Sequence, residues 1–192
     1  MIKKGIVFVL IASLFISCSV LQQLGKQTTE ALNIRNCSFN LHSVDNVNIG
    51  GVDVKNLKSL SLGNIATLSA CMLAKKLPIT MGVNVGASNP SDKDASISKM
   101  LWQCTIDDIS LAEGTTTGSY KIPAQGSTVI PISVTADAYQ IFSSTGLEAV
   151  KSFIGTFTNN STTSSRLAVK VKPTIEMGAS TVTLPFISLA SN

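Results

Sequence analysis

The sequence predicts a mainly β protein, a β-sandwich with two short amphipathic helices. About eight short segments alternate apolar and polar residues, which is the pattern of strands that bury one face. Gly, Pro, Asn and Asp gather between these segments, as they do in turns. Only two stretches have a helical period, whereas a parallel α/β sheet needs strands and helices in alternation.

The clearest strand covers residues 77–88 and alternates over its whole length. Its apolar positions predict one buried face, made by Leu77, Ile79, Met81, Val83, Val85 and Ala87. The opposite face is small and polar, and two of its positions are glycines with no side chain to pack. Asn89-Pro90 is expected to end the strand.

Four further strands are predicted before residue 115, at 37–44, 47–54, 99–106 and 109–112. Gly50-Gly51 is expected to form a bulge in the second of them. Asp107-Asp108 predicts a hairpin turn, and Glu113-Gly114 predicts another turn. In the strand at 99–106 the inward row is Met100, Trp102, Cys104 and Ile106.

The later strands are predicted at 120–123 and 128–136, with Gln125-Gly126 as the turn between them. Two more alternating rows follow, Leu167, Val169 and Val171 and then Val182, Leu184 and Phe186. The outward positions Lys170 and Lys172, with Arg166 nearby, predict a solvated strand face, and contact with anionic lipid head groups is the alternative.

Two stretches have apolar residues at intervals of three to four and predict amphipathic helices. The first carries Ile65, Leu68, Cys71 and Met72. The second carries Leu147, Val150, Phe153, Ile154 and Phe157.

The amino-terminal stretch MIKKGIVFVLIASLFISCSV predicts an export signal. Lys3 and Lys4 precede an apolar run at 5–16 that is shorter than the roughly 20 residues of a membrane span. Ser17-Cys18 at its end resembles the lipobox of bacterial lipoproteins, although Phe15 stands where those proteins usually carry Leu. The resemblance implies a signal peptide at 1–17, lipidation of Cys18 and a tether at 18–33. A signal peptide without lipidation, with Cys18 in a disulfide, is the alternative.

The domain is therefore expected at 34–192, held at a membrane by its lipid. Ser19 follows Cys18 where, by resemblance to enterobacterial lipoproteins, Asp would favour the inner membrane. An acidic surface-export run is also missing there, so we expect the outer membrane and its periplasmic side. The net charge of +4 is not gathered in a basic patch, so nucleic acid is not an expected partner.

Besides Cys18 the chain has three cysteines, Cys37, Cys71 and Cys104, which cannot all pair. Cys37 and Cys104 have the parity of inward-facing strand residues, so free and buried thiols are expected. One disulfide between two of the three is the alternative, because an exported protein can form it.

Several of these segments resemble a known family. The strand LPITMGVNVGASNP, the aromatic strand around Trp102 and the turns LAEG and IPAQG resemble the late embryogenesis abundant type 2 family, also called the water-stress and hypersensitive-response (WHy) domain. The resemblance covers residues 33–189, with its best part at 77–134. It implies an immunoglobulin-like or fibronectin-like sandwich and an association with desiccation and stress tolerance. It also implies an envelope lipoprotein of the Bacteroidetes type, without a defined activity. The second helix departs from the simplest form of the family.

The residues that would carry chemistry are sparse. His42 is the only histidine and is expected on the surface, which excludes most metal sites and catalytic triads. Asp92 and Asp94 offer fewer oxygens than calcium needs, so a solvated loop is expected there. The sequence thus predicts no catalytic, cofactor-binding or metal-ligating residue, and a protein that is not an enzyme.

The expected function is that of a non-catalytic binding or structural module of the cell envelope, with a membrane anchor and an envelope protein as partner. The expected interaction face is the outward side of the clearest strand, Thr80, Gly82, Asn84 and Gly86, unless the first helix covers it. A lipid or apolar-ligand carrier with the helices lining a cavity, and a stress-protection protein, are the alternatives. The oligomeric state does not follow from the sequence.

Overall fold

The computed structural model describes residues 33–54, 57, 59–116, 118–158, 167–177 and 180–189. The predicted signal peptide, Cys18 and the tether up to residue 32 lie outside these residues. All described residues except Asn33 belong to the predicted domain at 34–192.

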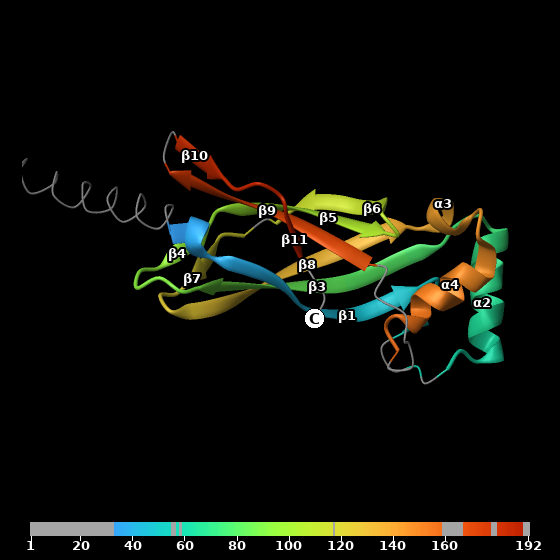
Figure 1. The fold of residues 1–192 in the computed structure, drawn as a ribbon. Coiled ribbons are helices and arrows are strands. Elements are labelled where there is room, and N and C mark those ends of the chain that lie inside the picture. The colour runs from blue at the N-terminus through green and yellow to red at the C-terminus, as the bar shows by residue number, and fades with distance from the viewer. Residues whose placement is uncertain are drawn as a thin grey trace, which may run out of the picture.

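Two antiparallel sheets form the body of the fold (Figure 1). The first sheet has the order β2-β1-β3-β8, formed by Val52–Asp53, Ser38–Ile49, Pro78–Asn89 and Gly126–Asp137. The second has the order β10-β9-β5-β6, formed by Ser180–Thr183, Leu167–Met177, Lys99–Ile106 and Ile109–Thr115. Strand β11, at Ile187–Leu189, also pairs with β9. A separate pair, β4 at Ala95–Ile97 and β7 at Tyr120–Ile122, lies at one end.

The core lies between the two sheets, because alternate residues of the long strands point inward. The inward rows include Ile79, Met81, Val83, Val85, Ile130 and Ile132 of the first sheet and Met100, Cys104, Ile106, Val169 and Val171 of the second, each at most 3% exposed. Burying such side chains is the main stabilising contribution to a fold of this kind. The predicted mainly β sandwich is therefore confirmed.

The helices lie together at the end of the sheets opposite β4 and β7 (Figure 1). Helix α2 is Leu62–Leu73 and is capped by Ser61, whose side chain accepts a hydrogen bond from the Asn64 backbone N–H at 3.1 Å. Helix α4 is Gly146–Gly155 and buries Val150, Phe153 and Ile154. This position places both predicted helices beside the sheets' ends, not between the sheets, where the carrier alternative needs them. No described helix reaches the length and hydropathy of a bilayer span.

Two very short helices were not predicted. Helix α3, Tyr139–Phe142, has four residues, too few to display a helical period. It is held to α4 through Phe142 and Phe153, whose ring centroids are 5.6 Å apart. The 3-10 helix η1, Ile34–Asn36, precedes β1 and buries Ile34.

The structure corrects the prediction for the first strands. Residues 38–49 form one strand, β1, which continues through two bulges at Leu41/Ser43 and Asp45/Asn48. Gly50-Gly51 is not a bulge but the turn into β2, and its φ angles of 59° and 87° are ones that glycine adopts without strain.

The expected turn at Glu113-Gly114 is also wrong, because β6 continues to Thr115. Glu113 pairs with Gln103 and Gly114 pairs with Trp102 in the ladder between β5 and β6. The glycine is there because the Trp102 side chain occupies the space that its own side chain would need.

The predicted last strand is interrupted. Val182 lies in β10, residues 184–186 lie in no strand, and the chain returns to β9 only at β11. The other predicted strands lie within two to three residues of the observed ones, and Asp107-Asp108 forms the predicted hairpin turn with φ angles of 49° and 64°.

Candidate functional site

The four residues of the predicted interaction face lie together on the outer side of β3. Thr80 is exposed, Gly82 and Asn84 are half-buried, and Gly86 is buried. They alternate with the buried residues of the same strand, because β3 is regular over all its 12 residues.

Side chains of β1 lie over the two glycines. Asp45 is opposite Gly82 and Asn40 is opposite Gly86 in the antiparallel register. A Cβ atom at Gly82 would lie against Asp45 Oδ1, and one at Gly86 against Asn40 Oδ1. The glycines are therefore covered by the Asp45 and Asn40 side chains of β1 and not by helix α2.

Asn84 connects the two strands on this side. Its amide nitrogen donates to Ser43 Oγ at 2.9 Å and to Asp45 Oδ2 at 2.8 Å. We call the outward residues of β1 and β3 the polar face: Asn40, Ser43, Asp45, Thr80, Gly82, Asn84 and Gly86. The β1 residues were missed because two bulges shift the parity of that strand, and only the pairing with β3 shows which side chains point outward.

The polar face continues onto β8, which is the edge strand of the first sheet. Its outward residues are all exposed: Ser127, Val129, Pro131, Ser133 and Thr135. Hydroxyl, amide and small side chains dominate this surface, so it is suited to a neutral, hydrogen-bonding partner. Pro131 has no N–H to offer at the edge, which disfavours pairing with a further strand.

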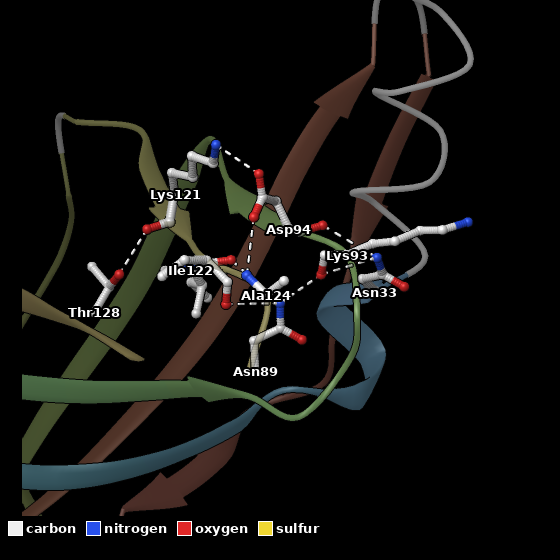
Figure 2. Close-up of polar contacts among 9 residues, drawn as sticks. Asn33, Asn89, Lys93, Asp94, Lys121, Ile122, Ala124 and Thr128 are labelled. Carbon is white, nitrogen blue, oxygen red and sulfur yellow. Dashed lines mark hydrogen bonds and ion pairs between the residues drawn. The ribbon is translucent and has the colours of Figure 1, made fainter. Parts of the chain in front are cut away.

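A second polar cluster lies at the β4–β7 end of the sandwich (Figure 2). Asn89 is 2% exposed. Its amide nitrogen lies 2.8 Å from the Lys93 carbonyl oxygen and 3.3 Å from those of Ile122 and Pro123. Its amide oxygen accepts from the Ser91 backbone N–H at 3.0 Å. One asparagine thus joins the end of β3, the following turn and the end of β7.

Asp94 completes this cluster, which we call the Asn89 clasp (Asn89, Asp94, Lys121 and Ala124). Asp94 Oδ2 is 2.6 Å from Lys121 Nζ, and Asp94 Oδ1 accepts from the Ala124 backbone N–H at 2.9 Å. The hydrogen bond from Lys121, followed by that from Ala124, lowers the pKa of Asp94 below its ordinary 3.8. Asp94 therefore serves the fold as a charged acceptor. Within the described ranges, no three His, Cys, Asp or Glu side chains are grouped to hold a metal ion.

The first described residues are attached to this clasp. Asn33 donates from its side chain to the Asp94 carbonyl oxygen at 3.2 Å and to that of Lys93 at 3.4 Å (Figure 2). Ile34 next to it is 1% exposed. The described part of the chain therefore starts at the β4–β7 end, far from the helices (Figure 1).

Cys37, Cys71 and Cys104 are free in the structure, as predicted. Cys104 is buried and Cys37 is half-buried, and burial raises the pKa of each thiol to about 11. The Cys71 sulfur lies 3.6 Å from the Gly50 carbonyl oxygen, so it packs α2 against the β1–β2 turn. His42, at the first bulge of β1, is exposed as expected.

Two of three comparisons with known proteins found a match. The family model described as late embryogenesis abundant protein (LEA_2) matches residues 84–188, from the middle of β3 into β11. A crystal structure of a protein from Archaeoglobus fulgidus aligns with a TM-score of 0.39 and 14% identity, covering 78% of this chain and 92% of that one. The comparison with curated proteins gave no match. Since the family model covers more than half of the sequence, the chain belongs to the late embryogenesis abundant protein family LEA_2.

Proposed function

We propose that this chain is a non-catalytic lipoprotein of the bacterial cell envelope, whose LEA type 2-like domain is a binding module anchored through acylated Cys18 to the outer membrane on its periplasmic side. The observation that carries the proposal is the attachment of Asn33 and Ile34 at one end of the sandwich. An anchor on the preceding residues would pull on that end alone. The polar face and the helices would then stay free for a partner.

The titratable groups support a binding role over a catalytic one. Asp137 accepts hydrogen bonds from the backbone N–H groups of Tyr139 and Leu77, both at 2.9 Å, and these lower its pKa, much as Asp94 is held in the clasp. The raised pKa values of Cys37 and Cys104 keep their thiols protonated and unreactive near neutral pH. The two aspartates are thus stabilised as carboxylates and the two cysteines as neutral thiols. A catalytic acid or nucleophile instead has a pKa that lets it gain or lose a proton near the working pH.

The polar face supports an envelope protein as the partner. Its amide and hydroxyl groups are fixed on two paired strands, and Asn84 is already oriented by Ser43 and Asp45. A photoreactive amino acid at Thr80, which is exposed, should capture a partner in intact membranes. The matched control is the same substitution at Thr181, an exposed residue of the second sheet. Capture from neither position, or equally from both, would remove the polar face as the interface.

The anchor has a separate test. Mass spectrometry of the mature protein should find Cys18 as the first residue, carrying acyl chains. Several acyl chains make release from the membrane negligible. The Cys18→Ala variant cannot carry them, so it should be lost from the outer-membrane fraction. An unmodified sulfur at the mature amino terminus would contradict the anchor while leaving the binding role open.

Membership of the late embryogenesis abundant family favours a second candidate, protection during drying or osmotic shock. Deletion of the chain should then lower survival after drying, and restoring the wild-type chain should recover it. Unchanged survival would discard this candidate.

A further inference from the structure

On the outer face of the second sheet, three side chains lie in a row across the strands: a lysine in the middle and an exposed apolar side chain on each side of it. Leu101 of β5 is opposite Lys172 of β9. On the other side of Lys172 lies Phe186, because the next residue, Ile187, pairs with Val171. Lys172 Nζ is 5.5 Å from the centre of the Phe186 ring. Leu101 is 37% exposed and Phe186 is 42% exposed, so neither is part of the core.

A parallel row lies one step along the same strands. Lys170 is exposed and lies between Gln103 of β5 and Ser188 of β11. We call Leu101, Lys170, Lys172 and Phe186 the basic face.

The acidic side chains nearby are engaged with other groups. Glu176 is 2.8 Å from Lys99 Nζ, and Glu113 accepts from Gln103 at 3.2 Å. Among the described residues, neither Lys170 nor Lys172 forms an ion pair. In the part of the chain that the structure describes, the basic face therefore presents two cations that are not directly paired with a carboxylate.

This combination fits the surface of an anionic membrane. Lysine stems can lie along apolar surface while their ammonium groups reach lipid phosphates, and Phe and Leu can enter the boundary between head groups and acyl chains. Each lysine close to an anionic leaflet strengthens binding roughly fivefold. We propose that the basic face of the second sheet lies on a bilayer that contains anionic phospholipid.

The proposed lipid anchor is compatible with this orientation. The inference rests on that anchor only because the anchor brings the domain close to the membrane. The residues from Cys18 to Asn33 can span about 50 Å when extended. That is longer than β3, whose 12 residues extend over about 40 Å. The domain can therefore lie on its side, and the polar face on the opposite sheet would then point away from the bilayer.

Lysine acetylation read by mass spectrometry tests the docking of the basic face. The mature, lipidated protein is placed on phosphatidylcholine vesicles with or without phosphatidylglycerol. Lys170 and Lys172 should react several-fold more slowly on the anionic vesicles, and added salt should abolish the difference. Lys75, Lys76 and Lys93, which are exposed elsewhere, should react equally on both. Equal reactivity of Lys170 and Lys172 on the two vesicles, or equal protection of all five lysines, would overturn the proposal.

Variants separate docking from anchoring. In the Cys18→Ala background, K170E/K172E should bind phosphatidylglycerol vesicles at least roughly 30-fold more weakly, whereas K75E/K76E should bind like its parent. If lipidation of Cys18 proves wrong, this comparison still tests the basic face. If K170E/K172E binds the vesicles like its parent, docking fails while the anchor stands. Protection of Lys170 and Lys172 by soluble polyglutamate as strong as by anionic vesicles would point to an acidic protein and overturn the membrane as the partner.

Discussion

The indole ring of Trp102 lies against Gly114 across the β5–β6 pair, so closely that a Cβ atom at Gly114 would be 2.6 Å from Cζ2 and 2.9 Å from Cε2 of the ring. Gly114→Ala should therefore lower the free energy of unfolding by about 1–3 kcal/mol, because a rigid ring must move within a packed sheet. Urea denaturation followed by Trp102 fluorescence measures the change.

Gly155→Ala is the matched control. Gly155 is the last residue of α4, and a Cβ atom there would meet nothing within 4 Å. Alanine favours the helix, so this variant should gain up to about 1 kcal/mol. Equal effects of the two substitutions would contradict the packing of Trp102 on Gly114.

The same pair of residues illustrates what the sequence can predict. Alternation identified β3, β5 and β9, because a strand with one buried face carries that fact in its own residues. Glycine is ambiguous. At Gly50-Gly51 it serves a turn with positive φ, and at Gly114 it leaves room for a side chain 12 positions earlier in the sequence. Only the pairing of strands distinguishes these roles.

The candidate site was predictable to a similar extent. The outward row from Thr80 to Gly86 followed from the parity of β3, but its cover by Asn40 and Asp45 depends on the register of β1. Asn89 was expected only to end a strand. Its partners Ile122, the last residue of β7, and Pro123 lie 33 and 34 residues further along the chain, and no local pattern marks them.

Asn89→Ala should lower the free energy of unfolding by about 2–3 kcal/mol, because it leaves buried carbonyl groups without their donor. Asn36→Ala should cost less than about 0.5 kcal/mol, since Asn36 donates a 3.4 Å hydrogen bond to Ser91 Oγ at an exposed position. The urea midpoints of the two variants provide the comparison. A small effect at Asn89 would show that the clasp does not hold the β4–β7 end together.

The Asp94–Lys121 pair predicts a specific dependence on acid. Because the folded pKa of Asp94 is below its ordinary 3.8, ionised Asp94 favours the fold above that pH. This contribution is lost as the pH falls below 3.8 and through the folded pKa. The stability difference between wild type and Asp94→Asn should therefore shrink in that window, as thermal unfolding across pH would measure. A difference that stays constant down to low pH would contradict this role for Asp94.

The buried thiols predict slow alkylation. At pH 8 iodoacetamide should modify Cys104 only as fast as the protein unfolds, and Cys37 faster than Cys104 because it is half-buried, while urea should equalise them. Fast labelling of native Cys104 would show that the core between the sheets opens.

The same thiols predict a loss of stability at alkaline pH. In the unfolded chain they ionise from pH 9.0 upward, whereas in the folded protein their pKa is about 11, so the free energy of unfolding should fall across that interval.

Gly82→Ala contrasts with Gly114→Ala and tests how firmly the polar face is built. Its new Cβ atom would also meet a neighbour, but that neighbour is the end of the flexible Asp45 side chain, which can rotate away. The cost should therefore be about 1 kcal/mol or less, mainly from the lost hydrogen bond between Asn84 and Asp45. Because the fold is kept, any loss of capture from Thr80 in this variant reports on the arrangement of the face itself. If Gly82→Ala destabilises as much as Gly114→Ala, Asp45 is held rigidly, and the face offers a partner a preformed surface that cannot adapt.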